Sequence, residues 1–440
     1  MMMITAATFP FDFNLGGDWK LPSKKARPFC WCLVLFSCPL FLTAQTTITT
    51  SDFLSKAFEN QTILLHERQL DFLKNTDHEL PWADQLEFRT ETDEMDLNRQ
   101  EYLMRFRYHT RAERQAQRNL HQSDIQQQEL KKTDLLEEAL LDHYFLLVKY
   151  VALDREINIV QQQQLVAADK LTVLRKKAAA LSDFNLNDLL NAESKTHELE
   201  LKKMELEGEF QQLKKTMLIP FGADENIKLD TTNILSIPAL INKIPLLSGT
   251  VATKSELAQR QLAIEKTGLE LEKEKAENNW QLDYVQFKHA SRDNLTYARE
   301  WSFGMGVEIP LKGNNKLAKN EIMLERIELE NRLTLQTISL NEQLQKKQQE
   351  LNLKINQYNL AIQQLSDSQL QFSYDNYPQF NDTDPLLLLN IKANILNRQG
   401  NLLNIEKDIY LLYLEIIELS GKAVEMPLRN YLNNNWELLE

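Results

Sequence analysis

Residues 301–321 read WSFGMGVEIPLKGNNKLAKNE, and apolar side chains occupy every second position of the first half. These apolar positions are Trp301, Phe303, Met305, Val307, Ile309 and Leu311. Alternation with a period of two is typical of a strand that has one apolar face and one polar face. The residues that follow instead predict a helix of roughly 60 residues. A mainly helical chain therefore carries a strand whose apolar face needs a partner.

Three other segments alternate in the same way, so the sequence predicts two β-hairpins. The first is expected at 84–92 and 100–110, and the second at 280–289 and 300–311. A change of parity after Tyr284 predicts a β-bulge there. Candidates for the apolar faces are Tyr102, Met104, Phe106, Tyr108, Trp301, Phe303, Met305, Val307 and Ile309. Candidates for the polar faces are Glu101, Arg105, Arg107, His109, Glu308 and Lys312.

The order helix, hairpin, long helix, break and return helix occurs twice along the chain. The helices are expected at 52–80, 111–180 and 186–217, and again at 253–278, 316–374 and 385–420. At a shift of 199 residues, Gly222 matches Gly421 and Leu189-Leu190-Asn191 matches Leu388-Leu389-Asn390. The sequence thus favours an internal duplication, with Pro-containing residues 218–252 as a linker or small equatorial element between the copies.

The long helices carry apolar residues at alternating steps of three and four. Leu333, Leu340, Leu344, Leu351 and Ile355 follow this spacing in the second copy. Such a repeat predicts coiled-coil packing against other helices. At 1.5 Å per residue, a helix of 60 to 70 residues is roughly 90–105 Å long, which is typical of a spacer or a tube.

The first 44 residues read as a secretory signal peptide. Lys24, Lys25 and Arg27 precede an apolar run of about 15 residues that ends at Leu42-Thr43-Ala44, and a membrane-spanning helix needs about 20. All three cysteines lie in this run, so the mature chain is expected to lack disulfides. Cys38 resembles a lipoprotein site only faintly, and cleavage after Ala44 is the favoured interpretation.

These patterns predict five regions. They are the signal peptide (1–44), a first repeat (45–217), the linker or equatorial element (218–252), a second repeat (253–421) and a C-terminal tail (422–440). The first repeat holds hairpin 84–110 and coiled-coil helices 111–217, and the second holds hairpin 280–311 and helices 316–420.

Two interpretations of the hairpins compete. The apolar faces could pack on helices as a small soluble sheet, or they could face lipid. Export, strands of about 9–12 residues and aromatic residues near the strand ends favour the membrane. Because open strand edges are not tolerated in lipid, several chains would then have to combine their hairpins into one closed barrel. The polar faces would line its lumen.

In this organisation the sequence resembles the TolC-like outer-membrane efflux and secretion ducts, over essentially the whole mature chain. The resemblance rests on the duplicated element order, the strand end VEIPLKGNNKLAKNE, the motif NDLLNAE at 187–193, and the glycines Gly222 and Gly421. It implies a mainly α fold with a small membrane β part, in which a trimer forms a 12-stranded barrel joined to a 12-helix coiled-coil tunnel. It also implies a gated channel in the outer membrane of a Gram-negative bacterium, with a periplasmic adaptor and an inner-membrane transporter as partners.

The resemblance implies that side chains at the helix breaks ring the periplasmic aperture. The positions that match are Asp188 and Asn191 in the first copy and Leu387 and Asn390 in the second, with Asp183, Asp382 and Asp384 close by. Leu387 stands where some members have an aspartate, so the acidic ring is incomplete. The glycine usual before each break is also absent, which puts the family's usual adaptor contacts in question.

No pattern predicts an enzyme, a cofactor or a metal site. The seven histidines are scattered, and neither a Gly-rich phosphate loop nor a G-x-S-x-G motif occurs. A net charge of −13 argues against nucleic acid as a partner. Two alternatives to a duct stay open: an exported coiled-coil adaptor whose strands belong to a soluble sheet, and a structural coiled-coil protein.

Overall fold

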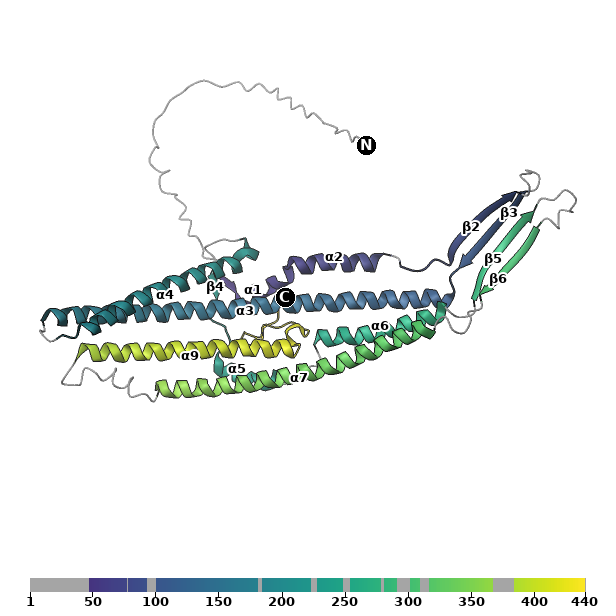
Figure 1. Cartoon of the computed structure of the whole chain (residues 1–440). Coiled ribbons are helices and arrows are strands. Elements are labelled where there is room, and N and C mark those ends of the chain that lie inside the picture. Colours follow the sequence, from purple (N-terminus) through teal and green to yellow (C-terminus); the bar gives the residue numbers. More distant parts are fainter. Residues whose placement is uncertain are drawn as a thin grey trace, which may run out of the picture. The chain divides into compact units, whose positions relative to one another are not determined.

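The computed structural model describes residues 47–76, 78–92, 100–180, 184–222, 228–247, 254–277, 281–290, 301–308, 316–366 and 384–439. Within these ranges the chain is mainly helical and carries one four-stranded antiparallel sheet (Figure 1). The predicted signal peptide with its cysteines, and the helix breaks at 181–183 and 367–383, lie outside the described residues.

The helices begin and end close to the residues that the apolar spacing indicates. The long ones are α3 (Arg111–Ala180), α4 (Leu186–Leu218), α6 (Ser255–Glu277), α7 (Lys316–Ser366) and α9 (Pro385–Leu419). The expected single helix at 52–80 is wrong, because α1 (Thr50–Ser55), η1 (Lys56–Glu59) and α2 (Gln61–Asn75) replace it. Asn60 makes this break, since its side chain accepts a hydrogen bond of 3.0 Å from the N–H of Thr62 and caps α2.

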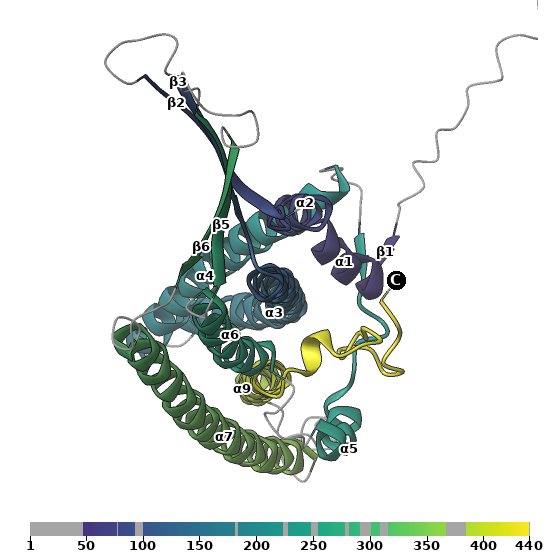
Figure 2. The ribbon, with the colours of Figure 1, turned by 90° about the vertical axis from the view of Figure 1, so that its right-hand side faces the viewer.

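Helix α3 is the element on which most of the other helices pack. Near its start it contacts α2 and α6, and further along it contacts α4 and α9. Polar contacts mark this path: Lys266 Nζ lies 2.7 Å from Asp124, and Arg155 lies 3.1 Å from Glu406. Helix α7 packs on α9 and α6, which gives the contact order α4–α3–α9–α7 (Figure 2).

Three segments distant in sequence pack around the middle of α3 and the end of α9. They are 47–59, 228–247 and 422–439, here called the central cluster; they contain β1 (Thr47–Thr49), β4 (Lys228–Asp230), α5 (Ile237–Leu247) and η7 (Lys422–Val424). Strands β1 and β4 pair in parallel. Gly222 and Gly421 follow the two return helices with φ of 85° and 67°, a left-handed conformation that glycine adopts readily.

The sheet consists of β2 (Ala83–Thr92), β3 (Gln100–Tyr108), β5 (Gln281–Ala290) and β6 (Trp301–Glu308), in the order β2-β3-β5-β6. The two hairpins are joined by the antiparallel pair of β3 and β5, which places Met104 opposite Phe287. The predicted bulge is present, because the register of β5 against β6 shifts between Leu282 and Tyr284. As a result, Leu282 pairs with Val307 and Tyr284 with Gly306.

Candidate functional site

The apolar side chains of all four strands gather on one face of the sheet. The pairing places Phe88, Met104, Phe287 and Phe303 in one row across the strands. Phe287 and Phe303 lie edge to face with ring centroids 5.3 Å apart. Neighbouring rows hold Leu86, Phe106, Val285 and Met305 on one side, and Thr90, Tyr102, His289 and Trp301 on the other.

Much of this face is open to the surroundings in the single chain. Phe88 is 61% exposed and Phe303 58%, and Trp301, Met305 and Val307 are also exposed. An exposed apolar patch of contiguous large side chains marks a surface that meets lipid or another protein. Among the predicted members, Phe106 and Tyr108 are half-buried, and Ile309 lies outside the described residues.

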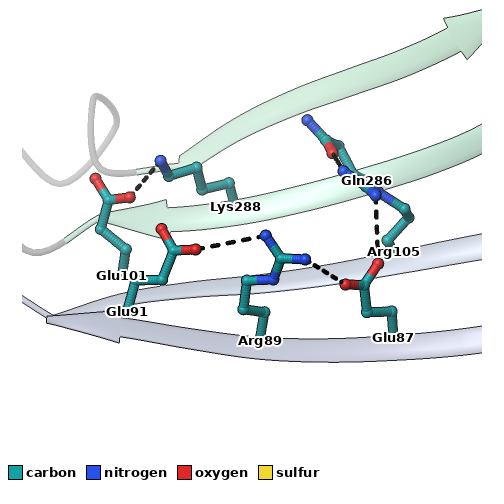
Figure 3. Close-up of polar contacts among 7 residues, drawn as sticks. All are labelled: Glu87, Arg89, Glu91, Glu101, Arg105, Gln286 and Lys288. Carbon is teal, nitrogen blue, oxygen red and sulfur yellow. Dashed lines mark hydrogen bonds and ion pairs between the residues drawn. The ribbon is translucent and has the colours of Figure 1, made fainter.

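The opposite face carries paired charges (Figure 3). Arg105 lies 3.3 Å from Glu87 and donates to the side-chain oxygen of Gln286 at 3.2 Å. Arg89 pairs with Glu87 at 2.9 Å and with Glu91 at 3.5 Å. Two more pairs join β3 to β5: Lys288 contacts Glu101, and Arg107 lies 3.7 Å from Asp283. Positive and negative side chains therefore alternate over this face, which could stay hydrated.

The other predicted polar-face residues lie at the ends of the strands or beyond them. His109 follows β3 and lies 3.5 Å from Asp84 and 3.4 Å from Glu113, at the start of α3. Glu308 ends β6 opposite Gln281, but its side chain is not among those described, and Lys312 lies outside the described residues.

A contact that periodicity did not indicate crosses the polar face at the bulge. The guanidinium of Arg105 lies over the ring of Tyr284, 4.3 Å from its centroid, a cation–π geometry. The ring lies over Gly306, where an added Cβ would be 2.2 Å from Cε1 of Tyr284. Gly306 therefore provides the space that lets Tyr284 contact Arg105.

Gly306→Ala is expected to destabilise the sheet by about 1–3 kcal/mol, because the new methyl group displaces a rigid ring. Gly304→Ala is the matched control, since its Cβ would meet the movable side-chain amide of Gln286 at 2.8 Å. Thermal unfolding followed by near-UV circular dichroism measures both variants. In a Tyr284→Ala background, Gly306→Ala should cost much less; an equal cost in both backgrounds would contradict the steric explanation.

The second candidate region lies where α4 and α9 begin beside the end of α3. Asp188, Asn191 and Asn390 line a groove of about 390 Å³ between these helices. Lys170, also in its lining, donates to the side-chain oxygen of Asn390 at 2.9 Å. Leu387 is exposed, and Asp183 and Asp382 lie outside the described residues. Three of the residues expected at the aperture, Asp188, Asn191 and Asn390, thus line one groove.

Asp384 connects the start of α9 to the end of α3. Its carboxylate accepts from the N–H of Leu386 at 3.2 Å, as an N-cap, and lies 3.0 Å from Nζ of Lys177. The hydrogen bond from Lys177, followed by that from the Leu386 backbone, lowers the pKa of Asp384 below its ordinary value. The sequence indicated Asp384, but not its lysine partner more than 200 residues away.

Asp384→Ala is expected to increase amide hydrogen exchange in the first turn of α9 about five-fold, corresponding to a lost cap of about 1 kcal/mol. Asp384→Asn is the control, because asparagine keeps the cap acceptor and removes the charge that pairs with the exposed Lys177. A folded pKa below the ordinary value of about 4 means that the carboxylate stabilises this turn above that pH. The part of the protection that comes from the charge should therefore decrease as the pH falls through the lowered pKa. Equal exchange in Asp384→Ala and wild type would argue against the cap.

The described residues hold neither a membrane-spanning helix nor a cluster of metal ligands. No helix in these ranges combines the length and apolar character that a bilayer crossing requires. Over the same part of the chain, no three His, Cys, Asp or Glu side chains are placed to hold a metal ion.

Solved outer-membrane proteins share this arrangement. The chain superposes on CusC, whose structures describe transmembrane channel formation, with a TM-score of 0.63 at 11% identity over 84% of this chain and 92% of CusC. It superposes on the outer membrane protein VceC from Vibrio cholerae with a TM-score of 0.58 at 13% identity, over 84% of this chain and 96% of VceC. It superposes on the Campylobacter jejuni CmeC outer membrane channel with a TM-score of 0.58 at 12% identity, over 84% of this chain and 85% of CmeC. No family model and no curated relative matches the sequence.

The protein combines a long helical bundle with a four-stranded antiparallel sheet that is apolar on one face and charged on the other. The chain has the fold of the TolC-like outer-membrane channels, as the resemblance in its sequence predicted.

Proposed function

We propose that this protein is an outer-membrane exit duct of a tripartite efflux pump or a type I secretion system, a passive gated channel from the periplasm to the exterior. The observation that carries the proposal is the sheet, whose exposed apolar face opposes a face of paired charges. A transmembrane barrel has an apolar surface toward lipid and a polar surface toward a water-filled lumen. The occurrence of both faces in a chain with the fold of outer-membrane channels supports the same use here.

Unpartnered helix faces support association of several copies. Helices α4 and α7 stand at the two ends of the contact order α4–α3–α9–α7. Leu190, Leu201 and Met204 are exposed on one face of α4 at helical spacing. Exposed apolar residues also follow one face of α7: Leu317, Leu324, Leu335, Leu353 and Leu360. Pairing α7 of one copy with α4 of the next is a heterologous contact, which forms a ring when the rotation closes.

The edges of the sheet also support a closed ring of copies related by one rotation. Its outer strands, β2 and β6, each leave one edge to pair with another copy. Three copies of four strands would form a 12-stranded barrel, and three copies of the four helices in the contact order α4–α3–α9–α7 would form a 12-helix tunnel. Closure removes the open edges that lipid does not tolerate. We therefore propose a homotrimer in the outer membrane, with Arg105, Arg107 and Glu101 facing the lumen.

Gating is proposed at the other end of the helices. The groove with Asp188, Asn191 and Asn390 lies at the starts of α4 and α9, where a separation of the helices would widen the tunnel. Lys177 and Asp384 bridge α3 and α9 there. A periplasmic adaptor, coupled to an inner-membrane transporter that supplies the energy, would shift these helices.

The direct test is location and assembly. The full chain is expressed with its own leader in a double-membraned bacterium, the membranes are separated, and the extracted protein is measured by native mass. A detergent-requiring trimer in the outer-membrane fraction is the expected result. A soluble periplasmic monomer or dimer would overturn the proposal and favour a soluble sheet packed in another assembly.

A further inference from the structure

An acidic hollow lies where the end of α9 and the start of α6 meet the middle of α3. Its volume is about 240 Å³. Carboxylates dominate its lining: Asp134, Glu137, Glu138 and Asp142 from α3 and Glu418 from α9. Lys254, just before α6, is the basic residue of the lining, and Phe145 provides an apolar side. The hollow therefore combines an excess of negative charge with an aromatic wall.

Glu137 is the unusual member, because it is buried while one of its oxygens lacks a partner. The residue is 7% exposed, and its Oε1 has no hydrogen-bond donor among the described residues. Two other residues of the lining have partners besides Glu137. Asp134 accepts a hydrogen bond from Gln259, and Nζ of Lys254 lies 4.0 Å from Glu256. Leaving a buried polar group unsatisfied costs about 1–3 kcal/mol, so the site favours a donor that the chain does not supply.

We propose that this hollow binds an organic cation, an alkylammonium or guanidinium group that carries an apolar substituent. The N–H groups of such a cation would donate to Glu137, and its charge would balance Glu138, Asp142 and Glu418. Its apolar part would contact Phe145, an aromatic ring that can also attract a cation. The site goes beyond the proposed function and does not depend on it.

A metal ion fits the hollow less well. Within the described ranges no three acidic, histidine or cysteine side chains are placed to hold one ion. The volume of about 240 Å³ exceeds the space that a single ion fills and leaves room for a small organic group that contacts several of the carboxylates at once.

Binding of a cation should displace a proton from Glu137. Burial raises the pKa of Glu137 to about 7; Lys254 opposes this shift, whereas Asp134, Glu418 and Glu256 add to it. Near pH 7 the carboxyl is therefore partly protonated in the free protein. A bound cation favours the carboxylate, so the pKa falls and a proton is released on binding. The affinity should accordingly weaken as the pH drops below about 7.

The test is isothermal titration of the full-length protein in detergent with benzylamine, which is a cation at neutral pH. The titration is repeated in two buffers of different ionisation enthalpy, with benzyl alcohol as the neutral isostere. Saturable binding of one benzylammonium per chain, proton release at pH 7 and much weaker binding of the alcohol are expected. No binding of the amine, or equal binding of the alcohol, would overturn the proposal.

Glu137→Gln supplies the matched variant. The neutral amide suits a buried position, and the variant should bind benzylammonium at least ten-fold more weakly and lose the dependence on buffer. Asp169→Asn removes one exposed carboxylate from the same helix outside the hollow, and it should bind as wild type does. Wild-type affinity in Glu137→Gln would refute the assignment, and the proton release of the wild type tests it without any substitution.

Discussion

Phe303→Arg should largely remove the protein from the outer-membrane fraction, whereas Ser302→Arg should leave most of it there. The two neighbours on β6 point to opposite faces of the sheet, because side chains alternate along a strand. Phe303 lies on the exposed apolar face, in the row with Phe287. If that face meets lipid, an arginine there costs about 2–4 kcal/mol near the middle of the bilayer.

Ser302 is a matched position because it receives the same charge on the same strand. It pairs with Lys288 on the face of charged residues, so a new arginine meets a like charge at a cost of roughly 0.2–1 kcal/mol. Membrane fractionation and the temperature at which the extracted oligomer dissociates measure both effects. Equal behaviour of the two variants would mean that the apolar face does not contact lipid.

Tyr144→Ala should destabilise the helical part of the protein by about 3–5 kcal/mol, through the cavity left by a large side chain. Tyr144 is fully buried in α3 at the centre of the core. Its hydroxyl donates to the carbonyl oxygen of Arg429 at 2.9 Å and accepts from the N–H of Tyr431 at 3.0 Å. Burial raises the pKa of this hydroxyl, which therefore stays protonated as a donor.

Tyr144→Phe separates the hydrogen bonds from the packing. It retains the ring but leaves the carbonyl of Arg429 and the N–H of Tyr431 without their partner, which should cost about 1–3 kcal/mol. Tyr150→Phe, six residues further along α3, keeps the ring packed on Phe210 with centroids 4.9 Å apart and should cost less than Tyr144→Phe, because it leaves the partners of Tyr144 in place. Denaturant unfolding followed by far-UV circular dichroism compares the three variants.

Loss of the Tyr144 hydroxyl should also release the C-terminal segment. Limited proteolysis at 425–439 is expected to be faster in Tyr144→Phe than in Tyr150→Phe. Identical unfolding and cleavage of the two variants would show that the central cluster does not depend on these two hydrogen bonds.

Local patterns were sufficient to predict the four hairpin strands and the long helices, but not the short strands β1 and β4. The alternation around Phe303 and Met104 places strands within a few residues of β6 and β3, since a period of two is a property of neighbouring residues. The parity change at Tyr284 likewise located the bulge. The break at Asn60 was missed because the apolar spacing continues across it and only a side-chain cap separates the helices.

Contacts between distant residues could not be predicted in the same way. Asn191 and Asn390 were indicated one by one, but their common groove depends on the packing of α4 and α9 against α3. The contact of Arg105 with Tyr284, and the space for it at Gly306, depends on how β3, β5 and β6 pair.

The sequence by itself determined the long helices, the strands of the two hairpins and which of their residues share a face, because these follow from the chemistry of residues close together in the chain. Only the tertiary structure decided the strand order β2-β3-β5-β6, the central cluster around Tyr144 and the hollow around Glu137. Each of these joins segments separated by more than a hundred residues. Their formation depends on the packing and hydrogen bonding of whole surfaces, which no local period encodes.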